Sequence, residues 1–265
     1  MPEFDVFLLG YGLLVGCLAG AAGGTLAGLA GLGGGLIYVP VFYATMPGDQ
    51  QTMSLHIIGS MVAIVVTGFF SARSHWRLGH IHKASFRQLI PGLMIGAALG
   101  LWLTLRIPEA VVLFGLALLD GWIAFDYGRE VRSWGNSPSL TLCSGPIGYI
   151  AGTLGIGGGT MLVPLLRRSL PLREAVGTSA LCGMAMAAAA VLINVVFESA
   201  WKELLGGQIL FLAGAWLGIL LILPVATGWS AHLHASIPEI RLRPVLKGLF
   251  AGLSAVLALS AMVVI

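Results

Sequence analysis

Two glycine clusters interrupt a chain that is otherwise built from long apolar stretches. The first is Gly33, Gly34 and Gly35, and the second, 124 positions later, is Gly157, Gly158 and Gly159. When the clusters are aligned without a gap, the flanking residues also coincide, with Gly28, Gly31, Pro40 and Pro47 falling on Gly152, Gly155, Pro164 and Pro171. Corresponding breaks in two apolar halves of one chain point to the binding site of a membrane transporter.

The composition places the chain in a lipid bilayer. Hydrophobic residues make up 57% of it and charged residues 9%, whereas a soluble domain carries about 25% charge. Apolar runs long enough to cross about 30 Å of hydrocarbon as helices recur throughout, and the short alternating segments of a β-barrel are absent. We therefore expect one transmembrane domain over residues 1–265. The three cysteines lie in apolar segments and predict neither a disulfide framework nor a zinc site.

Ten apolar segments can be distinguished. They cover residues 4–27, 31–45, 54–72, 86–105, 108–125, 140–154, 158–166, 175–197, 205–226 and 245–265. The second and seventh are shorter than the bilayer at 1.5 Å per residue. These two are half-helices, re-entrant hairpins, or crossings completed by extended backbone. The predicted fold is an all-α polytopic membrane protein with eight full transmembrane helices plus two short or broken segments.

The basic residues predict the orientation. If the N-terminus is outside and all ten segments cross, every one of the 14 Lys and Arg residues except Arg106 and Lys202 lies in an inside loop. This bias is a strong topology signal. Re-entrant short segments would move the basic residues at 167–173 to the outside, so the bias favours crossing. Both termini are then outside.

Five segments per half make the repeat inverted. The halves, at about 4–126 and 139–265, begin on opposite sides of the membrane. Their corresponding loops carry opposite charge, since the turn at 46–49 is acidic and the turn at 167–174 is basic. Inverted repeats are typical of alternating access around a central site.

The paired motifs resemble the sulfite exporter TauE/SafE family of bacterial permeases. The resemblance rests on GLAGLGGGLIYVP at 28–40 and GTLGIGGGTMLVP at 152–164, the latter followed by AVGTS at 175–179. Met53-Ser54-Leu55-His56 stands where the family commonly has a Gly-Thr-Ser-Leu-like turn. The resemblance implies transport of sulfite, sulfonates or related small sulfur anions across the bacterial inner membrane. In that membrane, the charge-based orientation makes both termini periplasmic. We expect no cofactor, no metal and no nucleic-acid partner; glycine-rich helix faces would permit a homodimer.

The glycine clusters have a chemical rationale as an anion site. Moving a small charge into low dielectric costs tens of kcal/mol by the Born estimate, so a carrier must replace the lost water with hydrogen-bond donors. Helix N-termini present unpaired N–H groups and a partial positive charge, and glycine lets backbone approach a ligand closely. Both clusters are therefore predicted to bind the substrate. The alternative is that they only permit tight helix packing, as the glycines at positions 16, 20 and 24 do.

Hydroxyl groups follow each break. Ser54 begins the third segment, Thr178 and Ser179 begin the eighth, and Thr160 comes directly after the second cluster. These side chains are candidate donors to oxyanion oxygens, and the alternative for the segment starts is N-capping.

Three polar residues lie deeper in the spans. His56 is a candidate neutral donor or proton carrier, or else a buried histidine satisfied by backbone. Asn194 either reaches the site or joins two helices. Asp120 is a candidate coupling group for a proton or sodium ion, unless it lies near the cytoplasmic interface. His75, His80 and His82 form a loop cluster that we expect to be solvated rather than metal-binding.

Function is best predicted as export of a small oxyanion. One charge crossing 100 mV is worth about 2.3 kcal/mol, so a negative interior drives an anion outward without a coupling ion. The alternative is a proton- or sodium-coupled importer of sulfonate- or thiosulfate-like anions. An intramembrane enzyme is disfavoured, because Ser54 and His56 are two residues apart and do not share a helix face.

Overall fold

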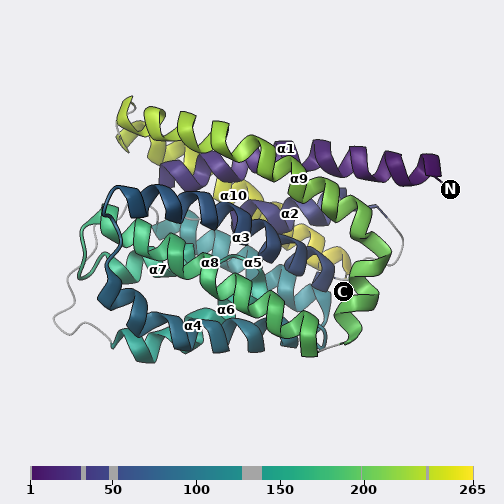
Figure 1. Ribbon diagram of the computed structural model, residues 1–265, viewed down its shortest axis with the longest axis horizontal. Coiled ribbons are helices and arrows are strands. Elements are labelled where there is room, and N and C mark those ends of the chain that lie inside the picture. Colours follow the sequence, from purple (N-terminus) through teal and green to yellow (C-terminus); the bar gives the residue numbers. More distant parts are fainter. Residues whose placement is uncertain are drawn as a thin grey trace.

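The computed structural model describes residues 2–30, 34–47, 53–126, 139–197, 199–236 and 239–264, and all of its regular structure there is helical (Figure 1). The helices are α1 (Pro2–Ala30), α2 (Gly35–Thr45), α3 (Met53–Arg77), α4 (Lys83–Leu103), α5 (Glu109–Asp126), α6 (Leu140–Leu154), α7 (Gly159–Leu166), α8 (Leu172–Phe197), α9 (Ser199–Ser236) and α10 (Glu239–Val264). Each corresponds to one expected apolar segment.

Within the described residues, five helical stretches are long and apolar enough to cross a membrane. They are Val6–Ala27, Met53–Arg77, Lys83–Leu103, Leu172–Phe197 and Gln208–Thr227. Large apolar side chains on the outer faces are open to the surroundings, including Phe197 at 83% exposure and Leu142 at 78%. An exterior with so many exposed large apolar side chains is matched by lipid rather than water. The expectation of an all-α polytopic membrane protein is confirmed, while the count of eight full spans stays a prediction.

Two pairs of parallel helices form the outer layers of the bundle. In the first pair, Gly12, Gly16 and Gly20 of α1 lie directly against the α9 backbone at Phe211, Ala215 and Ile219. In the second, the α6 backbone at Gly148 and Gly152 lies against Leu93 and Ala97 of α4. In both pairs the residue numbers of the contacts increase along both helices, so the two helices of each pair are parallel. Small residues four apart let such helix backbones touch, and Figure 1 shows the pairs on opposite sides of the molecule.

The central layer contains α3 and α8, which run in opposite directions. Gly68 of α3 packs on Met184 of α8, whereas His75, further along α3, packs on Gly177 near the start of α8. α5 and α10 form a further pair, in which the Ser254 hydroxyl donates to the Ala117 carbonyl at 2.7 Å. The short helices α2 and α7 pack beside α3 and α8. The start of each short helix is therefore held against the central α3–α8 pair.

Candidate functional site

Left-handed glycines form the break between α6 and α7. Gly155, Gly157 and Gly158 have φ angles of 69°, 73° and 69°, a conformation that costs other residues roughly 1–2 kcal/mol. Gly158 is the N-cap of α7, and its carbonyl accepts the first helical bonds, from the amides of Met161 and Leu162 at 3.1 and 2.8 Å. The amides that precede these begin the helix without an intrahelical acceptor.

The break before α2 is built differently but lies against the first. Gly34 is the N-cap of α2, and its carbonyl accepts the amides of Ile37 and Tyr38 at 3.0 and 3.1 Å. A Cβ at Gly35 would lie 2.6 Å from the carbonyl carbon of Ile156, so Gly35 touches the α6–α7 break. Gly33 lies outside the described residues. The two helix starts therefore meet, as the duplicated motif requires.

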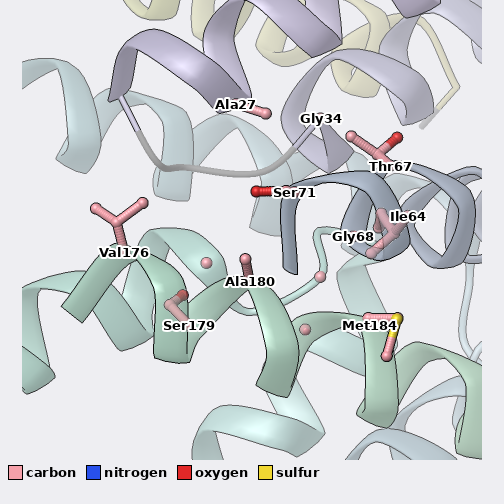
Figure 2. A pocket seen from close by; sticks show the side chains of 13 residues that line it. Ala27, Gly34, Ile64, Thr67, Gly68, Ser71, Val176, Ser179, Ala180 and Met184 are labelled. Atoms are coloured by element: carbon pink, nitrogen blue, oxygen red, sulfur yellow. The ribbon is translucent and has the colours of Figure 1, made fainter. Parts of the chain in front are cut away.

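A partly open cavity lies where the breaks meet the α3–α8 pair (Figure 2). Its empty volume, including the space at its mouth, is about 420 Å³. Gly34 comes from the first break, and Gly157 and Gly159 come from the second. The remaining walls are mainly the C-terminal half of α3, from Ile64 to Ser71, and the N-terminal half of α8, from Val176 to Met184. The part of this space that the centre of a water-sized sphere can reach is about 30 Å³, and about 10–15 Å³ of such space holds one water molecule, so the cavity has room for about two water molecules.

Neutral polar groups give the cavity its chemistry. Ser179 is 1% exposed, and its hydroxyl has no hydrogen-bond partner in the described part of the chain. Thr67 is already engaged, because its hydroxyl donates to the Ala63 carbonyl at 2.8 Å and lies 2.7 Å from the Tyr38 hydroxyl. Ser71 adds a half-buried hydroxyl on the opposite wall from Ser179 (Figure 2). None of the 13 described lining residues is charged.

Several predicted site residues instead join helices. The Ser54 hydroxyl donates to the Thr104 carbonyl at 2.8 Å, and the Thr178 hydroxyl accepts the His82 amide at 2.9 Å. Asn194 donates to the carbonyls of Ala98 and Ala190, both at 2.9 Å, and its side-chain oxygen accepts the Trp201 indole N–H at 3.2 Å. None of these three side chains lines the cavity described above.

Comparison with known proteins identifies the family. The family model described as "Sulfite exporter TauE/SafE" matches residues 16–260. The chain belongs to this family. A probable membrane transporter protein of Haemophilus influenzae is 34% identical over 184 residues, which cover 65% of this chain and 69% of that protein. One of Methanocaldococcus jannaschii is 27% identical over 187 residues, covering 67% and 69%. No solved structure matches.

The TauE/SafE assignment makes the chain a multi-pass membrane protein of a transporter family rather than an enzyme family. Three further residues that sequence reasoning singled out lie off the cavity of this family member. His56 and Asp120 are fully buried, and neither ring nitrogen of His56 nor either oxygen of Asp120 has a partner among the described residues. The Thr160 hydroxyl, in the first turn of α7, is buried and unpartnered in the same way.

Sequence reasoning missed the α3 wall of the cavity. Thr67 and Ser71 are four residues apart and therefore share one helix face, with Gly68 beside them. Their spacing was visible in the sequence. The expectation of a solvated histidine loop also needs correction: His75 and His80 are half-buried with ring centroids 5.8 Å apart, and both pack on Gly177.

Proposed function

We propose that this protein carries small sulfur-containing oxyanions, such as sulfite or an organosulfonate, across the bacterial inner membrane. The observation that carries the proposal is the cavity built from both glycine breaks, with the unpartnered Ser179 hydroxyl in its wall. The amides that begin α2 and α7 and the hydroxyls of Ser179 and Ser71 replace the water that the anion gives up. Backbone N–H groups at helix starts suit an anion because their dipoles present positive charge.

The directions of the helix pairs support an inverted repeat of residues 4–126 and 139–265. The α1–α9 and α4–α6 pairs are parallel, whereas α3 and α8 are antiparallel. If helices alternate in direction along the chain, this combination arises only when α2 and α7 each complete a crossing. The repeat relates α1 to α6, α9 to α4 and α3 to α8. Exchanging the two halves therefore turns the α1–α9 pair into the α6–α4 pair and keeps α3 paired with α8. Alternating access would then occur by exchange of the conformations of the two halves.

Export is the proposed direction. The cavity lies nearer the ends of α3 and α8 that adjoin Arg73, Arg77 and Arg173, which the positive-inside rule assigns to the cytoplasm. In this state the site would load from the cytoplasm. The termini, by the same rule, are periplasmic. A negative interior then favours outward movement by about 2.3 kcal/mol per charge per 100 mV, so no coupling ion is needed.

Binding to the purified protein tests the site. Sulfite, thiosulfate and sulfoacetate are titrated by calorimetry or thermal shift against wild type, Ser179→Ala and Ser169→Ala. A hydrogen bond to a charged group contributes about 1.5–3 kcal/mol, so Ser179→Ala should weaken binding about tenfold or more. Ser169→Ala is the matched control, because its exposed hydroxyl only contacts the Leu166 carbonyl, away from the cavity. Equal affinity in all three proteins, or no binding of any oxyanion, would refute the site.

Flux in proteoliposomes tests direction and coupling. We expect anion efflux to follow the sign of an imposed membrane potential with no proton or sodium gradient present. Strict dependence on such a gradient, with no response to potential, would favour a second function, coupled import. The buried and unpartnered carboxyl of Asp120 is the observation that favours this alternative. Asp120→Asn should abolish accumulation by an importer coupled there and leave passive export unchanged.

A further inference from the structure

The conformation described above gives no reason for a histidine at position 56. His56 is 0% exposed, and both ring nitrogens lack a hydrogen-bond partner in the described chain. Its ring contacts Tyr43 edge-on at a centroid distance of 5.4 Å. A neutral imidazole has one donor and one acceptor, and a buried polar group without a partner is unfavourable. A conformation that gives the imidazole a hydrogen-bond partner would remove this cost.

The internal repeat indicates which conformation that is. The 124-residue offset that aligns the glycine breaks continues into the central helices and places Gly59 of α3 on Gly183 of α8. By the same offset, His56 corresponds to Ala180 and Ser60 to Met184. Gly183, Ala180 and Met184 all line the open cavity. Their counterparts Gly59, His56 and Ser60 are all buried at the other end of the α3–α8 pair.

We propose that His56 and Ser60 line a second anion half-site, which opens at the end of the α3–α8 pair opposite the present cavity. The inference rests on the proposed function, because it requires that the two halves exchange conformations during transport. In that exchange His56 takes the place that Ala180 has now and projects into the cavity. Ser60 takes the place of Met184.

The second half-site needs the donors of His56 and Ser60, because the hydroxyl groups of the present cavity have no counterparts there. By the same offset, Ser179 is replaced by Leu55, Thr67 by Val191 and Ser71 by Val195. The hydroxyls that surround an anion in the present cavity thus have apolar counterparts. The imidazole N–H of His56, one residue from Leu55, restores the donor that Ser179 supplies, and the Ser60 hydroxyl adds another.

The present contacts of both residues explain why this half-site is closed. The Ser60 hydroxyl donates to the Gly155 carbonyl at 2.7 Å and ties α3 to the α6–α7 break. His56 is covered by the half-buried ring of Tyr43. Opening therefore requires one hydrogen bond to break and one aromatic ring to move, and it frees the donors of both residues for the anion.

Thiol labelling from each side of the membrane tests the inference. Ser60→Cys and Ser71→Cys are made separately in a full-length background in which Cys17, Cys143 and Cys182 are alanine and transport is retained. A membrane-impermeant maleimide is applied to vesicles of each orientation, with and without methanesulfonate, which does not react with maleimide. We expect Ser71→Cys to be labelled from the side of the basic loops and Ser60→Cys from the opposite side, each at least threefold more slowly with the anion present.

The possible results separate the two proposals. If Ser71→Cys is protected by the anion but Ser60→Cys is never labelled from the opposite side, the second half-site is wrong and the proposed function stands. If the anion protects neither cysteine, and sulfite binding is also absent, both fail.

His56 variants provide an independent measurement. His56→Leu should lower flux at least tenfold while anion affinity in the present cavity changes less than threefold, and His56→Gln, which keeps a donor, should recover part of the flux. Equal flux in wild type and His56→Leu would overturn the role of the imidazole.

Discussion

The close approach of α4 and α6 gives a sharp stability prediction, because helical glycines of this protein face different surroundings. A Cβ added at Gly148 of α6 would lie 2.5 Å from the Leu93 carbonyl oxygen and 2.8 Å from its Cα. A Cβ added at Gly10, in the interior of α1, would meet nothing within 4 Å. Gly148→Ala and Gly10→Ala therefore make the same chemical change with opposite steric consequences.

The size of the effect follows from the geometry. An ordinary Cβ contact is 3.4 Å or longer, so Gly148→Ala must displace the α4 backbone by about 0.9 Å. Overpacking of a close-packed interface costs typically about 1–3 kcal/mol. Both variants gain roughly 0.5–1 kcal/mol from replacing glycine within a helix, so this term cancels between them. We expect Gly148→Ala to be the less stable variant by about 1–3 kcal/mol.

Thermal unfolding in detergent measures the difference. The protein contains seven tryptophans, so intrinsic fluorescence reports the transition, and both variants are heated at one scan rate. Gly148→Ala should unfold several degrees below wild type, and Gly10→Ala should match wild type or exceed it. Apparent midpoints within one degree of each other, or a reversed order, would refute the direct backbone contact between α4 and α6.

Three other substitutions test particular contacts. Gly158→Ala should cost roughly 1–2 kcal/mol, because the N-cap of α7 has a φ of 69°; a wild-type unfolding midpoint would contradict this. Trp201→Phe should destabilise by about 1–3 kcal/mol, since it removes the buried donor to Asn194, and the same thermal assay measures it. Gly183→Ala would place a Cβ 2.6 Å from the Gly157 carbonyl oxygen, so calorimetric sulfite affinity should fall at least about threefold through displacement of the break.

Hydropathy located the helices well but not their ends. The segment expected at 140–154 coincides with α6, whereas α3 continues past the expected residue 72 to Arg77 and α9 extends to 38 residues. Apolar content reports where the chain contacts lipid. Helical hydrogen bonds do not stop at that boundary, so a helix continues into polar residues until a cap or turn ends it. The left-handed Gly79, with a φ of 72°, lies in the turn that follows α3.

The glycine breaks were predictable because they are duplicated, whereas the orientation of side chains was not. Ser54 and Ser179 both lie shortly after a break, and the sequence gives them equal standing. In the fold the Ser54 hydroxyl donates to the Thr104 carbonyl, whereas the Ser179 hydroxyl, in the cavity wall, has no hydrogen-bond partner among the described residues. The difference arises from the rotation of each helix against its neighbours, which depends on contacts between distant segments. For the same reason, the sequence did not indicate that Thr67 and Ser71 line the cavity.

A lining without charge has a consequence for the electrical behaviour of the proposed carrier. An unpaired arginine in the cavity would itself be costly inside the membrane and would hold an anion strongly. Amides and hydroxyls bind more weakly, so the anion can leave as well as enter. The empty carrier also reverses its orientation without moving a charged lining group, since none of the described lining residues is charged.

The charge moved in one cycle is then that of the anion alone. A dianion would move two charges, worth about 4.6 kcal/mol at 100 mV, and the reversal potential of the proteoliposome current should shift with the anion gradient accordingly. A current that reports fewer charges than the anion carries would require a co-transported cation, and Asp120 would then be the first residue to test.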